Sequence, residues 1–247
     1  MSQLSATALN FRRRIEDEAC FPETCDGGDP GTPDRPSTWL LGIEPGWSLA
    51  DSISAENEGE NRDKALAHYG IELQLGWPYN RNAFKLFAAI NGLPVEDYVR
   101  FAEHARPFER GSNGYFKGNL FPEPFNKVGS WDDKAACATG FATKTDYQEW
   151  QRSVRFGVMR KWIAKCKPKI VIGTGFTHLH DFLAITGTEK TPTPQHFEVN
   201  GHSKKVYIAT CGIVPVAVVP HLSGGPHGLN SDEAIRISAG LIRDVGS

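Results

Sequence analysis

Glu44 is the residue of this chain whose surroundings most clearly suggest chemistry. It follows the apolar run 39–41 and stands between Gly42 and Gly46, with Pro45 beside it. The proline restricts the turn, and the glycines let backbone or ligand come close. A carboxylate held there could act as a general base on water or stabilise a developing cation. Helix capping or pairing with an arginine explains the same pattern equally well, and both interpretations remain open.

His221 is the second candidate, because it directly follows the apolar run VPVAVVP. The loop after it reads LSGGPHGLNS, which is rich in glycine and in hydrogen-bonding groups and ends at a predicted helix start. A histidine there could donate to an anionic leaving group or a carbonyl, assisted by helix amides. A histidine that merely anchors the loop is the alternative. Three glycines and two histidines within residues 221–228 favour a functional role.

Alternating strands and helices must position these two residues. Apolar runs predict strands at about 38–43 and within YFKGNLFPEPF, KIVIGTG and VPVAVVP. Periodicity and capping predict helices over 4–19, 60–70, 81–91, 146–166, 177–185 and, behind an N-cap at Ser231, 232–244. The stretch HFEVNGHSKKVYIAT predicts a β-hairpin around Asn200-Gly201, a small insertion near 196–210.

Buried strands that alternate with helices predict an α/β protein, a three-layer α/β/α fold with a central, mainly parallel sheet. Such sheets bind ligands at the carboxyl ends of their strands. The residues at those ends are Glu44, Asn119, the glycine turn 173–175 and His221. If the strands are neighbours, a carboxylate, an amide and a histidine converge on one edge.

Length and composition predict one domain over 1–247, with an N-terminal helix and irregular arm at 1–37 and a core at 38–245. No apolar run approaches the ~18 residues of a membrane span, and the N-terminus lacks the apolar core of a secretory signal. We therefore expect a cytoplasmic protein with no membrane partner.

Metal and cofactor motifs are missing from the sequence. The five cysteines include no Cys-x-x-Cys pair, so neither a disulfide scaffold nor a zinc ribbon is predicted. The run IVIGTG has His178 where a dinucleotide fingerprint needs its third glycine. No cofactor and no metal are expected.

The charge pattern says little about partners. The net charge is −2, so the overall charge does not indicate a nucleic-acid partner. Residues 151–175 nevertheless carry seven basic side chains and no acidic one. A phosphate-facing patch and a solvated helix followed by a basic turn both fit this segment.

Several separated motifs, in order, resemble the uracil-DNA glycosylase superfamily over roughly residues 38–245. GIEPGWS is similar to its first motif, PYNRNAFKLFAAI to the following helix of the mismatch-specific uracil/thymine branch, and YFKGNLFPEP to the strand with the base-reading asparagine. KPKIVIGTGFTHLHDFL is similar to the third strand and helix, and VVPHLSGGPHGLN to the second motif. The single-strand-selective branch is also close in pattern. No iron–sulfur cluster is implied, because the four-cysteine pattern is lacking.

The resemblance implies an enzyme that flips a base from DNA into a pocket at the strand ends and hydrolyses its N-glycosidic bond. Carried over, Glu44 positions water and stabilises the sugar cation, His221 supports the departing base, and Asn119 reads its Watson–Crick edge. Tyr79 or Trp77 is implied as the stacking ring. The remaining implied residues line the base site (Gly42, Ile43, Trp47, Phe121) or form a DNA-contacting loop (Ser223, Gly224, Gly225, His227, Asn230).

Two departures from the family pattern affect these roles. Glu44 stands where Asp or Asn is usual and is one methylene longer, which shifts the water position. The second motif reads His-Leu-Ser with two extra glycines, so a rival register centred on His227 exists, although His221 follows the strand directly. Two alternatives to a DNA glycosylase therefore remain: a member that binds a base or nucleic acid without cutting it, and a hydrolase of free nucleosides or nucleotides.

Overall fold

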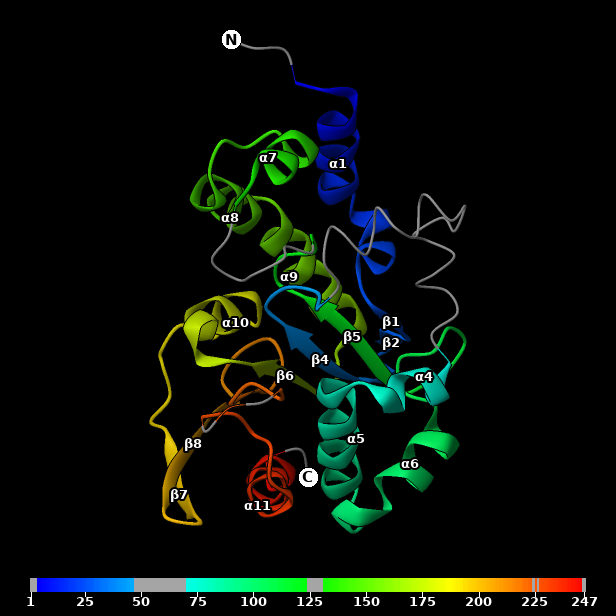
Figure 1. Ribbon diagram of the computed structural model, residues 1–247, viewed down its shortest axis with the longest axis vertical. Helices are drawn as coiled ribbons and strands as arrows, with labels where there is room; N and C mark the ends of the chain where they lie inside the picture. Colours follow the sequence, from blue (N-terminus) through cyan, green and yellow to red (C-terminus); the bar gives the residue numbers. More distant parts are fainter. Residues whose placement is uncertain (1–3, 47–69, 124–130, 224, 226, 246–247) are drawn as a thin grey trace.

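The computed structural model describes residues 4–46, 70–123, 131–223, 225 and 227–245. A seven-stranded mixed sheet with the order β1-β5-β4-β6-β9-β8-β7 lies at the centre (Figure 1). Its strands are β1 (Gly27–Gly28), β4 (Thr38–Gly42), β5 (Tyr115–Asn119), β6 (Ile170–Thr174), β7 (Gln195–Val199), β8 (His202–Ala209) and β9 (Val216–Val219). The four central strands β5, β4, β6 and β9 run parallel. The predicted strands and the mainly parallel sheet are therefore confirmed.

Helices cover both faces of this sheet (Figure 1). The α-helices are α1 (Ala6–Glu16), α4 (Ile71–Gly76), α5 (Pro78–Ile90), α6 (Tyr98–Ala105), α7 (Asp133–Thr139), α8 (Lys144–Ser153), α9 (Arg155–Cys166), α10 (Leu179–Ile185) and α11 (Asp232–Arg243). Short 3₁₀ turns occur at η1 (Glu18–Cys20), η2 (Pro22–Thr24), η3 (Val95–Asp97) and η4 (Phe176–His178). Helices α5 and α11 pack together on one face, and α9 and α10 pack on the other. The three-layer α/β/α arrangement is confirmed.

The central strands are apolar throughout because each is buried on both faces. In β4, Leu40 packs into the core beneath α5 and α11, whereas Trp39 and Leu41 pack into the opposite core with Phe182 of α10. All five residues of β4 and of β6 are buried. This double burial holds the strand ends rigidly, which is what a site at those ends requires.

The predicted hairpin exists, but it is not an insertion. Asn200 and Gly201 both adopt positive φ angles, 51° and 74°, as a tight two-residue turn requires. Strand β8 then pairs antiparallel with β9, which makes the hairpin the outer part of the central sheet. The prediction of an insertion was wrong because β8 forms the backbone hydrogen bonds that the outer edge of β9 would otherwise lack.

The arm at 21–37 was also predicted incorrectly as irregular. Residues Gly27–Gly28 form β1, which pairs antiparallel with β5 and extends the sheet at its other edge. A β-carbon on Gly28 would overlap the carbonyl oxygen of Tyr115, so the close approach of the two backbones needs glycine there. The adjoining β2 (Gly31–Thr32) and β3 (Arg35–Pro36) form a separate two-stranded ribbon.

The helix predicted over 146–166 is two helices, α8 and α9, separated at Val154. The single helix was predicted from a four-residue spacing of Trp150, Val154, Val158, Trp162 and Cys166, which drifts from the true helical period of 3.6. Tyr147 and Gln151 are buried on α8, and Arg155 begins the buried face of α9. Ser231 caps α11 as predicted, accepting from the Ala234 N–H.

Residues 60–69 of the helix predicted over 60–70 lie outside the described residues. None of the helices in the described part of the chain is both long and apolar enough to cross a bilayer.

Candidate functional site

The ends of the four parallel strands meet at one edge of the sheet, as the sequence predicted. Asn119 ends β5 and pairs in register with Gly42, the last residue of β4. Thr174 ends β6 and pairs with Val219, the last residue of β9. Glu44 and His221 each follow their strand by two residues, so all the predicted strand-end groups leave the sheet on the same side.

Gly42 and Ile43 lie among these groups. A β-carbon on Gly42 would overlap the Asn119 Oδ1 atom and would lie 3.7 Å from the Tyr79 hydroxyl. A β-carbon on Gly175 would lie 3.1 Å from Ile43 Cδ1 and 3.7 Å from His221 Cδ2. The glycines therefore make room for the amide and the imidazole at this edge.

Glu44 forms a buried ion pair with Lys144, the first residue of α8. The Lys144 Nζ atom lies 2.8 Å from Glu44 Oε1 and 3.0 Å from Oε2. The Glu44 side chain is only 3% exposed and that of Lys144 12%. Burial raises the pKa of Glu44 above its ordinary value, and the Lys144 ammonium partly offsets that rise. Glu44 is thus in an ion pair, as one of the two interpretations expected, but its partner is a lysine and not an arginine.

A second charged cluster lies near Glu44. His178 Nδ1 is 2.7 Å from the Asp181 carboxylate, and Arg152 donates two hydrogen bonds to the same carboxylate at 2.8 and 2.9 Å. Burial by itself would raise the pKa of Asp181, but the hydrogen bonds from His178 and Arg152 hold it below its ordinary value. Phe121 is fully buried and packs against the His178 ring at 5.2 Å. Phe121 therefore supports the site from inside the core.

His221 is held in one tautomer. The backbone N–H of Ser223 donates to His221 Nδ1 at 3.2 Å, and the Ser223 hydroxyl lies 2.8 Å from the same atom. A backbone N–H can only donate, so Nδ1 accepts and the neutral ring carries its proton on Nε2. Partial desolvation lowers the pKa of His221, which favours this neutral form. The His221 ring is therefore a neutral hydrogen-bond donor just beyond the end of β9.

The structure separates His221 from the rival His227. Both histidines are exposed, but only the His221 ring is in contact with the Tyr79 ring, at 5.6 Å between centroids, among the described residues. Leu222 is buried, and its carbonyl oxygen accepts from the Asn82 side chain at 2.6 Å. The register centred on His221 thus brings a histidine to Tyr79.

Two hydrogen bonds to backbone carbonyls hold the predicted DNA-contacting loop, one from within the loop and one from β8. Asn230 donates to the Gly225 carbonyl at 2.8 Å, and Lys204 of β8 donates to the Gly228 carbonyl at 2.9 Å. His227 and Asn230 are exposed and Ser223 is half-buried. Gly224 of this loop, and the predicted base-site residue Trp47, lie outside the described residues.

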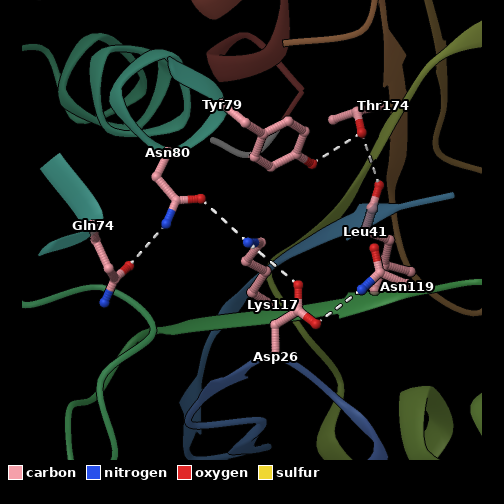
Figure 2. A network of polar contacts seen from close by, with 8 residues as sticks. All are labelled: Asp26, Leu41, Gln74, Tyr79, Asn80, Lys117, Asn119 and Thr174. Carbon is pink, nitrogen blue, oxygen red and sulfur yellow. Dashed lines mark hydrogen bonds and ion pairs between the residues drawn. The ribbon is translucent and has the colours of Figure 1, made fainter. Parts of the chain in front are cut away.

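Tyr79 lies in the site, on the first turn of α5. Its hydroxyl is 3.0 Å from Thr174 Oγ1, which in turn donates to the Leu41 carbonyl at 3.3 Å (Figure 2). Burial of that hydroxyl raises the pKa of Tyr79 far above its ordinary value. Trp77, the other candidate stacking ring, is the N-cap residue of α5.

The sequence interpretation missed a polar network beneath Asn119. Figure 2 shows the Asp26 carboxylate between Asn119 and Lys117. Asn119 Nδ2 donates to Asp26 Oδ1 at 2.9 Å, and Lys117 Nζ lies 3.2 Å from Asp26 Oδ2. Lys117 also donates to Asn80, which donates to Gln74. The available signal was an acidic residue, Asp26, directly before the glycine pair at 27–28.

Three of the seven basic side chains in the segment 151–175 form ion pairs or hydrogen bonds within the described chain. Arg152 pairs with Asp181, and Lys161 pairs with Glu18 at 3.0 Å. Arg155 is buried and donates to the Thr24 hydroxyl at 2.7 Å. These contacts weaken the interpretation of this segment as a phosphate-facing patch.

No group of three or more His, Cys, Asp or Glu side chains comes together as a metal site in the described residues. Neither a scan against protein-family models nor a search of curated proteins yields a match to this chain. The geometry at the strand ends is therefore the basis for assigning a function.

Proposed function

We propose that this protein is a monofunctional glycosylase that removes uracil or another damaged base from DNA by hydrolysing the N-glycosidic bond. The observation that carries the proposal is that Glu44, Asn119 and His221 stand at the carboxyl ends of three of four adjacent parallel strands, on one side of the sheet. Tyr79 lies against His221 at the same edge. A buried carboxylate, a carboxamide, a neutral imidazole and an aromatic ring are the groups needed to cleave a flipped nucleoside.

The proposed reaction is a hydrolysis at the sugar carbon C1′. The water oxygen forms a bond to C1′ as the C1′–N bond breaks, and the bonding electron pair leaves with the base. Glu44 accepts the water proton, and its charge stabilises the cationic sugar. The Nε2–H of His221 donates to the departing base anion, which then takes up a proton from solvent.

The neutral state of His221 suits this role. A neutral Nε2–H stabilises a developing anion by hydrogen bonding without first having to bind a proton from water. The Ser223 N–H fixes that tautomer from behind. The raised pKa of Glu44 makes its carboxylate a stronger base than an exposed one.

One observation favours a second candidate, a protein that binds a base in DNA without removing it. The Glu44 carboxylate is already balanced by Lys144 at 2.8 Å, which reduces the charge it offers to water or to a sugar cation. In that case a flipped base would be held by Asn119 and Tyr79 and stay attached to its sugar.

The deciding experiment incubates the protein with single- and double-stranded oligonucleotides that carry uracil, hypoxanthine or a G·T mismatch, and then cleaves abasic sites with alkali. We expect strand cleavage at one of these lesions, reduced about 100-fold or more by Glu44→Gln. Glu198→Gln, an exposed acid on β7, is the matched control and should cut like wild type.

Three other outcomes are distinguishable. Lesion-specific binding with no cleavage would support the non-cutting candidate and reject the glycosylase. Hydrolysis of free deoxyuridine in the absence of oligonucleotide cleavage would identify a nucleoside hydrolase instead. Equal cleavage by Glu44→Gln and wild type would reject the proposed mechanism.

A further inference from the structure

Asp26 reaches the site from a segment far from it in sequence. Its backbone N–H donates to the Lys117 carbonyl at 3.0 Å, and Gly27–Gly28 continue this pairing along β5. Side chains two residues apart on a strand point to the same face, so Lys117 and Asn119 both face the Asp26 carboxylate. Each carboxylate oxygen then contacts one of them, Oδ1 the Asn119 amide and Oδ2 the Lys117 ammonium.

This arrangement selects one of the two flips of the Asn119 carboxamide. A carboxylate paired with a lysine ammonium is only an acceptor, so the amide group that faces it must be the NH₂ group. Oδ1 of Asn119 is thereby turned toward Gly42, where the missing β-carbon leaves space for it. A flipped amide would place two oxygens against each other at the Asp26 contact.

The carboxamide is also confined sterically. Asn119 is 3% exposed, and Oδ1 has no hydrogen-bond donor within the described part of the chain. The Tyr79 hydroxyl borders the same space, but it is already hydrogen-bonded to the Thr174 hydroxyl. Lys117 is held from its other side by Asn80 at 3.2 Å, so the Asp26–Lys117 pair has little freedom to shift.

We propose that Asp26 is a positioning and specificity-determining residue that locks Asn119 with Oδ1 as the acceptor presented to the ligand. In the locked amide, Oδ1 can accept from a ring N–H while the NH₂ group donates to the carbonyl next to it. A ring with an unprotonated nitrogen next to an amino group would instead place acceptor against acceptor and donor against donor. Uracil and hypoxanthine are of the first kind, and cytosine and adenine are of the second. This inference rests on the proposed function only for the identity of the ligand as a base; the lock itself does not depend on catalysis.

The lock is tested directly by ¹⁵N NMR of the full-length protein, with the Asn119 side-chain resonances assigned from the Asn119→Asp spectrum. One Nδ2 proton bonded to a carboxylate should resonate well downfield of its partner. The separation should collapse in Asp26→Asn, whose amide can donate or accept, and persist in Asp29→Asn, a variant of the same arm. Similar separations in wild type and Asp26→Asn would overturn the proposal, and a small separation in wild type alone would do so even if that variant fails to fold.

The specificity is tested with oligonucleotides that carry uracil or cytosine at one position. In Asp26→Asn the ratio of uracil to cytosine excision should fall at least tenfold, mainly through KM, whereas Asp29→Asn should keep the wild-type ratio. An unchanged ratio with a lost NMR signature would overturn the specificity claim. If wild type excises neither base, the proposed function fails separately, and the same ratio is then measured as dissociation constants of the two oligonucleotides by fluorescence anisotropy.

Discussion

The Glu44 carboxylate and the Lys144 ammonium lie 2.8 Å apart although 100 residues separate them in the chain. The proposed catalytic carboxylate at the end of β4 is thereby tied to the first residue of α8. Both side chains are almost wholly buried, so the Glu44 carboxylate depends on the Lys144 ammonium for its charge balance.

Lys144→Met should therefore lower the free energy of unfolding by about 3 kcal/mol, because it leaves a buried carboxylate without its counter-ion. Urea denaturation measures this change. Lys161→Met, which removes the partner of Glu18 in an exposed pair, should cost less than about 1 kcal/mol. Adding Glu44→Gln to Lys144→Met should recover part of the loss. Equal effects of the two lysine substitutions would contradict a buried carboxylate that depends on Lys144 as its counter-ion.

The pH dependence of excision should carry the signature of Glu44. The mechanism needs the unprotonated carboxylate, so the rate should fall as pH drops through the pKa of Glu44, which burial places above the ordinary 4.5. Because Lys144 lowers that pKa, Lys144→Met should move the acid limb to higher pH. Single-turnover rates from pH 4 to 9 provide the measurement. A limb that stays in place in Lys144→Met would mean that another group titrates.

His221 should make stability depend on pH. Its pKa is lowered from 6.5 in the folded state, so below pH 6.5 the unfolded chain binds the proton more readily. The free energy of unfolding should consequently fall as pH drops from 6.5 through the folded-state pKa. His221→Gln should lose this component and His227→Gln should retain it, as measured by urea denaturation at pH 7.5 and 5.5. The same pH slope in both variants would contradict the assigned neutral state.

Gly42→Ala should damage the site without changing any polar group. Its new methyl group would overlap Asn119 Oδ1 and push the carboxamide away from Asp26, at a cost of about 1–3 kcal/mol in stability. Excision should fall together with stability. Gly46→Ala is the matched control, since a β-carbon there meets no atom of the described residues within 4 Å. Crystal structures of the two variants would show whether the Asn119–Asp26 contact is broken; its survival in Gly42→Ala would refute the steric argument.

Local patterns were sufficient to predict the central strands, the Asn200-Gly201 turn and the Ser231 cap. Each depends on residues close in sequence, such as an apolar run buried on both faces, a residue pair that tolerates positive φ, or a hydroxyl that accepts from an N–H three residues on. The position of Glu44, Asn119 and His221 on one side of the sheet was predictable for a related reason, because parallel strands all end on the same side.

The predictions that failed depended on pairing across the chain. The arm at 21–37 carries no long apolar run, so nothing in its own sequence indicates that Gly27–Gly28 pair with β5. The single helix predicted over 146–166 is broken at Val154, and the second helix begins at the buried Arg155, whose guanidinium reaches Thr24 and the Asn119 carbonyl.

The sequence by itself determined which groups stand at the strand ends, because strand direction and burial follow from local apolar patterns. Only the tertiary structure decided the state of those groups. Lys144 sets the charge balance of Glu44, the Ser223 N–H sets the tautomer of His221, and Asp26 sets the flip of Asn119. The Lys144 and Asp26 contacts join residues about 100 positions apart, and the Ser223 contact depends on the exact fold of its loop. Hydrogen bonds of this kind act over about 3 Å, so they exist only once the chain has brought the partners together.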